Sequence, residues 1–214
     1  MEKKITGLFI AIEGVDGAGK TTAIEFLKKE FESANREVLT VADLYSTQLG
    51  GVVVNAFLHA EKNLDPMSEA LLIYAARNEL YQTVILPALL ADKIIIVDRW
   101  VDSTMAYQSA VKGVSPVAIK ALEALVITDR VPDVTVYLDC DLEGARKRMG
   151  GRRLDKHEKM GNEFHQKVRD SFENSLAKRR GSVTIIDASQ SLDKVQQKLS
   201  FITDMLLHSQ GLRD

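Results

Sequence analysis

Cysteine and proline are scarce in this sequence, and neither sign of charge dominates it. The single cysteine, Cys140, excludes an internal disulfide bond and is typical of proteins from a reducing compartment. Four prolines in 214 residues leave room for long helices. A formal net charge of −2 excludes both the strongly basic composition of many nucleic-acid binders and the acidic composition of disordered tails. We therefore expect no nucleic-acid partner.

Apolar runs long enough to cross a bilayer are also absent from the sequence. The segments Leu8–Ile12 and Ile94–Val97 are far shorter than the roughly 20 residues that a membrane helix needs. Met1–Lys4 leads directly into the first apolar segment, without the hydrophobic stretch of a signal peptide. These features predict a cytoplasmic protein with no membrane partner.

Short apolar segments alternate with helix-like segments along the whole chain. The expected strands are Leu8–Ile12, Val38–Val41, Lys93–Asp98, Val134–Leu138 and Val183–Ile186. The expected helices are Lys20–Ala34, Glu69–Leu90, Ile119–Val126, Leu142–Met149 and Leu192–His208. This alternation predicts a single α/β domain over residues 1–214, with a five-stranded parallel sheet and helices on both faces. Such sheets bind ligands beyond the carboxyl ends of their strands, so the residues that follow the strands are the candidate site.

A glycine-rich loop follows the first predicted strand. Gly14–Thr21 matches the pattern G-x-x-x-x-G-K-S/T, with an apolar strand before it and a helix after it. In such a loop the backbone N–H groups surround phosphate oxygens, Lys20 reaches the β- and γ-phosphates, and the Thr21 hydroxyl binds Mg²⁺. The alternative is a glycine-rich turn with an incidental lysine, and both flanks argue against it. The residues expected to bind the triphosphate are Gly14, Val15, Asp16, Gly17, Ala18, Gly19, Lys20, Thr21 and Thr22.

A second polar motif, Asp98-Arg99, ends the predicted strand at Ile94–Val97. Beside a phosphate loop, Asp98 would reach the metal ion or its waters. Arg99 would hold an acceptor phosphate through two parallel hydrogen bonds. Taken without the loop, a surface ion pair that caps the strand explains the motif equally well. The phosphate loop favours the functional interpretation, although ATPases, GTPases and small-molecule kinases all use such loops.

Four segments, in the same order along the chain, resemble those of thymidylate kinases. They are Phe9–Thr22, Asp98–Gln108, Pro132–Asp139 and Glu163–Arg169. The resemblance implies a P-loop kinase fold with a mobile lid at about residues 149–161. It also implies the phosphorylation of dTMP to dTDP with ATP and Mg²⁺, by direct in-line transfer, in an enzyme that is usually a homodimer.

The resemblance further implies roles on the acceptor side. Asp16 would contact the 3′-hydroxyl of the sugar or organise its phosphate, and Arg99 would hold that phosphate. Arg77 would bind the edge of the thymine base, and Tyr107 would crowd the 2′ position and so favour deoxyribose. In isolation, Arg77 would be interpreted as an exposed helix charge and Tyr107 as a core aromatic. The other residues expected to bind dTMP are Tyr45, Ile73, Thr104 and Gln108.

The strongest basic cluster is Arg146–Lys156, which contains a flexible Gly150-Gly151 pair. A solvated helix end is the alternative interpretation of such a charge run. Some thymidylate kinases carry an arginine in the phosphate loop, where this chain has Gly17, and others place the catalytic arginine in the lid. The resemblance is to the second type, in which lid closure brings positive charge to the transferring group. The roles implied are catalytic for Arg152 and Arg153, catalytic but less favoured for Arg148, donor-nucleotide contact for Arg146, and acidic lid residue for Glu158.

The chain departs from the family pattern at the acceptor site. The family commonly has R-E-P-G-G-T after its second strand, whereas this chain has Ala42–Gly50, with Asp43 in place of the glutamate. Ile73 stands where a phenylalanine usually stacks on thymine. Trp100 and Lys156 are further replacements. These changes leave the reaction class unchanged and predict an altered or relaxed preference for thymine.

Two alternative functions follow from the same residues. One is a kinase for another, or a broader, set of nucleoside monophosphates, and the other is a P-loop switch or ATPase without an acceptor. The Asp98–Gln108 segment argues against the switch, which has no need of a second nucleotide pocket. The apolar face of Glu69–Leu90 fits either a dimer interface or the buried core.

Overall fold

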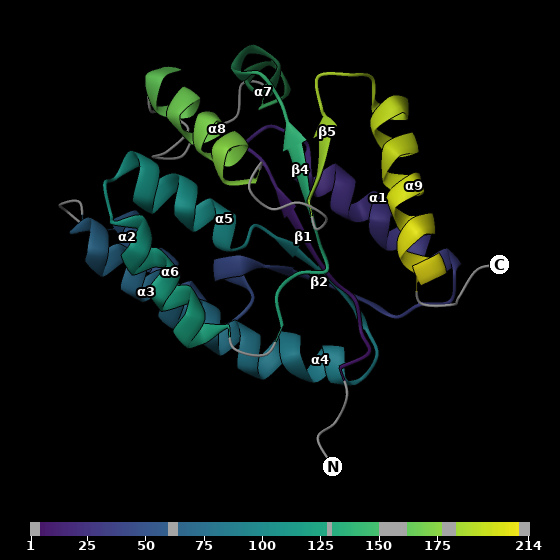
Figure 1. Ribbon diagram of the computed structural model, residues 1–214, viewed down its shortest axis with the longest axis horizontal. Helices are drawn as coiled ribbons and strands as arrows, with labels where there is room; N and C mark the ends of the chain where they lie inside the picture. Colours follow the sequence, from purple (N-terminus) through teal and green to yellow (C-terminus); the bar gives the residue numbers. More distant parts are fainter. Residues whose placement is uncertain (1–4, 60–63, 128–129, 150–161, 177–182, 210–214) are drawn as a thin grey trace.

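A sheet of five parallel strands forms the centre of the molecule (Figure 1). The computed structural model describes residues 5–59, 64–127, 130–149, 162–176 and 183–209. The strand order is β2-β3-β1-β4-β5, and every pair of neighbours is parallel. The predicted fold class is therefore confirmed. The strands are β1 (Phe9–Glu13), β2 (Val38–Ala42), β3 (Ile94–Asp98), β4 (Val134–Asp139) and β5 (Val183–Asp187).

Helices cover both faces of the sheet, which explains why the central strands consist of almost unbroken apolar residues. Along β1, Ile10 and Ile12 belong to one hydrophobic cluster, whereas Phe9 and Ala11 belong to the other. This alternation follows from the pleat of a strand, because successive side chains point to opposite faces. All four side chains are fully buried.

The two faces are covered by different sets of helices. The first cluster contains side chains of α1 (Lys20–Ser33), α8 (Asn162–Leu176) and α9 (Leu192–Ser209). The second contains side chains of one long helical segment, made of α3 (Pro66–Leu80), a π-helical turn (Tyr81–Ile85) and α4 (Leu86–Leu90). Further helical elements are a 3-10 turn (Asp43–Tyr45), α2 (Gln48–His59), α5 (Val101–Thr104) with a π-helical continuation (Met105–Val111), α6 (Pro116–Val126) and α7 (Leu142–Met149).

The order of the strands places the loops after β1 and β3 side by side. Ile12 of β1 is paired with Asp98 of β3, and the Arg99 N–H donates to the Ile12 carbonyl over 2.9 Å. β1 also pairs with β4 on its other side, so the strand order reverses at β1. A crevice at the carboxyl ends of the strands is expected at such a reversal.

All five predicted strands and all five predicted helices are confirmed, with boundaries that shift by a few residues. The Glu69–Leu90 helix begins earlier, at Pro66, because the Asp65 carboxylate accepts from the Ser68 N–H over 3.0 Å and caps its first turn. Helices α2 and α8 and the helical segment that starts at Val101 were not predicted from the sequence. In the part of the chain that the structure describes, no helix combines the length and the apolar character needed to span a membrane.

We expect the central strands to contribute much of the stability, and Ile96 tests this expectation. It lies fully buried in the middle of β3. We expect Ile96→Ala to lower the free energy of unfolding by about 2–5 kcal/mol, because it removes buried methyl groups and leaves a cavity. Chemical denaturation measures the change. The matched control is Ile185→Ala on β5, where the side chain is 53% exposed and the expected loss is below about 1 kcal/mol. Equal losses at both positions would contradict this account.

Candidate active site

The phosphate loop between β1 and α1 has the backbone shape that its glycines predict. Gly14 has a φ of 148°, and a Cβ there would lie 2.8 Å from the Leu138 carbonyl oxygen. No other residue type fits this position without a shift of the backbone. Gly19 has a φ of 95° and directly precedes the first turn of α1. The loop therefore ends at a helix N-terminus, where free N–H groups favour an anion.

Lys20 lies across this loop with its side chain buried. Its Nζ donates to the carbonyls of Gly14 and Val15, both over 3.2 Å, and lies 3.5 Å from the Asp16 carboxylate. Burial and repulsion from Arg99 lower the pKa of Lys20 to about 8, against the attraction of Asp16. The ammonium group remains mostly charged at neutral pH. Lys20, which is predicted to bind the phosphates, is thus held at the loop as a cation.

Arg99 joins the loop to the end of β3. Its Nη1 donates to the Gly14 carbonyl over 3.0 Å and to the Ser103 hydroxyl over 3.2 Å, and its Nη2 pairs with the Asp16 carboxylate. Burial opposes the ionisation of Asp16, but Arg99 and Lys20 outweigh it and hold the pKa of Asp16 at about 2. Arg99 itself has a φ of 67°, a conformation that is uncommon outside glycine.

Glu13, the last residue of β1, holds the Arg99 turn in place. Its fully buried carboxylate accepts from the N–H groups of Trp100 and Ser103, over 2.8 and 3.1 Å, and from the Ser103 hydroxyl over 2.6 Å. Burial and the Asp102 carboxylate raise the pKa of Glu13 to about 7. Glu13 was assigned no role from the sequence, although a carboxylate at the end of an otherwise apolar strand was a signal.

Asp98 and Thr21, the residues predicted to bind the metal ion, lie at the end of β3 and in the first turn of α1. Asp98 ends β3, and its Oδ1 is buried without a hydrogen-bond partner among the residues that the structure describes. Thr21 is exposed in the first turn of α1. An unpartnered buried carboxylate oxygen near a phosphate loop fits the oxygen ligands that Mg²⁺ prefers. The residues present therefore suit a magnesium ion that also binds phosphate oxygens.

A cavity of about 320 Å³ opens beside Asp16 and Arg99. Asp98 also lines it, as do residues that sequence analysis did not assign to binding, among them Asp43, Phe57 and Glu69. These residues come from β3, from the helical segments that follow β2 and β3, and from α3. The cavity is also lined by all the residues predicted to bind dTMP, namely Asp16, Tyr45, Ile73, Arg77, Arg99, Thr104, Tyr107 and Gln108.

The polar side chains of this cavity are held by partners. Arg77 is 1% exposed and pairs with Asp43, so the alternative of an exposed helix charge is wrong. The Gln108 amide donates to Glu69 over 3.0 Å, and Glu69 also pairs with Lys112. The guanidinium carbon of Arg99 lies 5.5 Å from the centre of the Tyr107 ring. Burial raises the pKa of Tyr107 to about 12, so its hydroxyl stays neutral.

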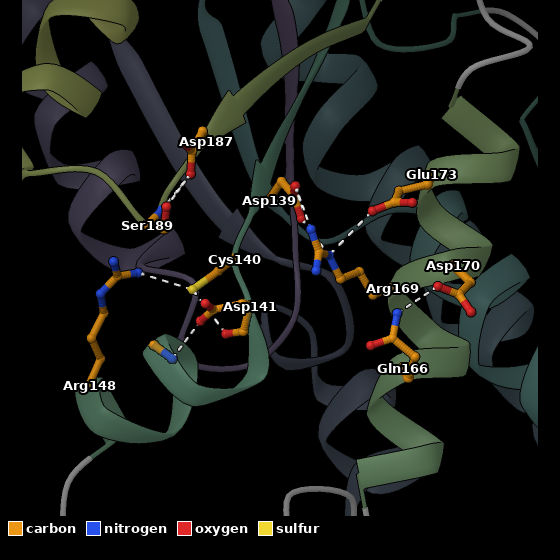
Figure 2. Close-up of polar contacts among 11 residues, drawn as sticks. Asp139, Cys140, Asp141, Arg148, Gln166, Arg169, Asp170, Glu173, Asp187 and Ser189 are labelled. Atoms are coloured by element: carbon orange, nitrogen blue, oxygen red, sulfur yellow. Dashed lines mark hydrogen bonds and ion pairs between the residues drawn. The ribbon is translucent and has the colours of Figure 1, made fainter.

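A smaller cavity of about 140 Å³ lies on the other side of the phosphate loop. Ala18, Gly19 and Thr22 line it together with Gln190 and Arg148. Arg148 reaches it from α7, where its Nη1 donates to the Cys140 sulfur over 3.4 Å and its Nη2 donates to the Ala188 carbonyl (Figure 2 shows the approach to Cys140). The structure therefore gives Arg148 a place beside the loop that the sequence analysis did not foresee.

Of the other charged residues assigned roles in the basic cluster and the lid, the structure describes Arg146 alone. Arg146 lies exposed on α7 and is not among the residues that line the smaller cavity, so its contact with the donor nucleotide stays a prediction. Arg152, Arg153 and Glu158 lie outside the described residues. Helix α8, which follows, is attached to the end of β4 by the ion pair between Arg169 and Asp139, with contacts of 2.8 and 2.9 Å (Figure 2).

Comparisons with known proteins agree with this arrangement. A family model described as thymidylate kinase matches residues 12–199. The thymidylate kinase of Pseudomonas fluorescens is 38% identical over 205 residues, which cover 95% of this chain and 98% of that protein. The thymidylate kinase of a Thermoanaerobacter species is 34% identical over 193 residues, which cover 90% of this chain and 95% of that protein.

A solved structure extends the likeness to three dimensions. The crystal structure of thymidylate kinase from Ehrlichia chaffeensis matches with a TM-score of 0.75 at 31% identity, over 92% of this chain and 98% of that chain. The family model and the relatives each span most of the chain, including the loop, the Asp98-Arg99 turn and the larger cavity. The chain therefore belongs to the thymidylate kinase family, whose members phosphorylate dTMP with ATP.

Proposed function

We propose that this thymidylate kinase transfers the γ-phosphoryl group of ATP directly to the 5′-phosphate of dTMP. The observation that carries the proposal is the position of the phosphate loop between two cavities. Asp16 of the loop lines the larger cavity, and Ala18 and Gly19 line the smaller one. A loop that cradles phosphates can thus serve a donor on one side and an acceptor on the other. A switch without an acceptor has no use for the larger cavity.

On the donor side, the loop residues Gly14–Thr22 bind the triphosphate of ATP. Lys20 can bind a phosphate, since among the described residues its ammonium group contacts two carbonyls and a carboxylate at 3.5 Å. A phosphate offers it a stronger partner than a carbonyl does. The smaller cavity, with the Gln190 amide and the Arg148 guanidinium in its wall, receives the nucleoside of the donor.

A magnesium ion completes this site in our proposal. The Thr21 hydroxyl and the Asp98 carboxylate would hold it, directly or through water. When bound, the ion neutralises charge on the β- and γ-phosphates. Asp98 has a carboxylate oxygen that no described residue uses, which supports this assignment.

On the acceptor side, the larger cavity receives dTMP. Arg99 binds the acceptor phosphate, and Asp16, which it holds, faces the sugar. Arg77 and Gln108 face the base edge, and Ile73 packs on the base. The acceptor oxygen is already anionic, so transfer requires alignment and charge neutralisation rather than a strong general base. Further positive charge comes from the lid, where Arg152 and Arg153 are the proposed catalytic residues.

Replacing Lys20 tests the donor site. We expect Lys20→Ala to abolish measurable turnover, a fall in kcat of more than about hundredfold, because the γ-phosphate loses the positive charge of the lysine that contacts it. A coupled assay of dTMP-dependent ADP release measures the rate, and circular dichroism checks the fold. Lys28→Ala, on the same helix with a half-exposed side chain, is the control and should retain full activity. Near-normal turnover by Lys20→Ala would refute the donor-site assignment.

Replacing Arg99 tests the acceptor site. We expect Arg99→Ala to lower kcat/KM for dTMP by roughly hundredfold, because a charged phosphate partner in the cavity wall is lost. The KM for ATP should change far less. Arg99→Lys keeps a charge without the paired hydrogen bonds, and its kcat/KM for dTMP should lie between those of the wild type and Arg99→Ala. Steady-state kinetics with each substrate varied in turn gives these constants. A larger effect on ATP than on dTMP would place Arg99 on the donor side instead.

We also propose that the enzyme is a homodimer, formed through α3 and α6. These helices pack against each other, and they expose Leu71 (48%), Val117 (76%) and Leu125 (76%). Exposed apolar side chains gathered on neighbouring helices favour association. The other side of α3 is buried, which agrees with the core interpretation of its apolar residues, and the proposed interface uses the exposed side.

A charge on the exposed face of α3 tests the dimer. Light scattering after size-exclusion chromatography is expected to give twice the chain mass for the wild type and the single chain mass for Leu71→Glu. The control is Phe201→Glu on α9, on the opposite side of the sheet. The Phe201 side chain is 65% exposed, and this variant should remain dimeric. A monomeric wild type would disprove the proposal.

A further inference from the structure

A buried ion pair forms part of the wall of the larger cavity. Asp43 lies in the 3-10 turn after β2, and Arg77 lies on α3. The Arg77 Nε donates to Asp43 Oδ1 over 3.1 Å, and Nη2 pairs with Oδ2, so one edge of the guanidinium faces the carboxylate. Asp43 is 8% exposed and Arg77 is 1% exposed. Two parallel contacts of this kind fix both the position and the plane of an arginine.

The other groups around Arg77 occupy the same nitrogen or the faces of the guanidinium. Nη2 also donates to the Thr104 hydroxyl over 2.9 Å, and the Trp100 carbonyl lies 3.4 Å from it. The rings of Tyr74 and Trp100 lie 4.9 and 5.3 Å from the guanidinium carbon. Nη1 is buried and has no hydrogen-bond partner among the described residues. A buried charged donor without a partner in a cavity wall is the group that a ligand satisfies.

We propose that Asp43 is a positioning residue for base recognition. It holds the Nε and Nη2 edge of Arg77 and leaves Nη1 free to donate to a carbonyl oxygen of the acceptor base. The inference rests on the proposed function in one respect, the binding of dTMP in this cavity. It adds a residue that acts through Arg77 and has no contact with the base itself.

The chemistry of Nη1 determines which bases it accepts. A 4-oxo pyrimidine such as thymine presents an acceptor oxygen, whereas a 4-amino pyrimidine such as cytosine presents an N–H donor at the same place. With cytosine, two donors face each other and Nη1 stays unpaired in a buried site, which penalises binding strongly. A guanidinium that is no longer held at its other edge can turn away and loses part of this discrimination.

The experiment compares dTMP with dCMP as acceptors for the purified enzyme at saturating ATP. For the wild type, kcat/KM should favour dTMP. In Asp43→Asn, we expect the dTMP to dCMP ratio of kcat/KM to fall at least tenfold, mainly through a higher KM for dTMP, with the KM for ATP unchanged. Asp43→Glu, which keeps the carboxylate, should restore most of the ratio. Because both substrates are measured on one preparation, the ratio does not depend on how much of a variant is folded.

Two further variants distinguish positioning from a general structural effect. Asp139→Asn breaks a two-contact ion pair of the same kind, with Arg169, at the end of another strand (Figure 2) and should leave the ratio unchanged. In an Arg77→Ala background, Asp43→Asn should have no further effect on the ratio, because the two residues act as one unit.

The outcomes separate this inference from the proposed acceptor site. If Arg77→Ala lowers the ratio and Asp43→Asn does not, Arg77 recognises the base without help from Asp43, and the inference is wrong. An effect of Asp43→Asn that persists in full without Arg77, or a loss equalled by Asp139→Asn, also overturns it. If neither Arg77→Ala nor Asp43→Asn changes the ratio, dTMP does not use this cavity, and the proposed acceptor site fails as well.

Discussion

The buried carboxylate of Glu13 is the constraint on which the rest of the site depends. It accepts three hydrogen bonds from Trp100 and Ser103, and these hold the chain in the sharp turn where Arg99 has a positive φ. The turn directs the Arg99 side chain back to the phosphate loop, where it contacts Gly14 and Asp16. One carboxylate at the end of β1 thus couples the phosphate loop to the arginine that we propose to bind the acceptor. Its burial is unfavourable for the charged form, as its raised pKa reflects, and the three hydrogen bonds offset part of that cost.

Local patterns were sufficient for most of the fold. A strand buried on both faces is a short apolar run, and a helix between two such runs must cross over the sheet, so the alternation alone predicted the parallel sheet. Helix α2 was not predicted because Gly50-Gly51 and the β-branched run Val52–Val54 both disfavour a helix locally. Packing overrides this, since Val53 and Val54 are buried. The helix at Val101 escaped because its N-terminus is capped by Glu13, 87 residues away from Trp100 in sequence.

In the site, as in the fold, features set by local sequence were predictable, and contacts between distant residues were not. The loop and the Asp98-Arg99 turn are contiguous motifs, and family resemblance assigned the acceptor residues that the cavity brings together. The ion pairs could not be predicted in this way, because partners such as Asp43 and Arg77 are 34 residues apart and come from separate elements. No local pattern shows which acid will meet which base. Arg148 is a similar case, since its neighbour Ala188 follows β5, beyond the end of the lid. Residue types were thus predictable, whereas their partners and orientations were not.

Because Ile73 stands where the family usually has a phenylalanine, discrimination between bases depends more on the polar wall of the cavity. A phenylalanine ring that stacks on the base has a preferred geometry, whereas the contacts of Ile73 and Phe57, which both line the cavity, depend mainly on buried area. Apolar burial separates two pyrimidines of similar size by little, because it does not distinguish an oxygen from an amino group. Discrimination between bases therefore falls to the donors at the base edge. A donor discriminates only if it cannot turn aside, and Arg77 is held at once by contacts from the 3-10 turn after β2, from α3 and from the segment after β3. The same chain that relaxes the apolar contact thus holds the guanidinium that we propose to face the base in a fixed orientation.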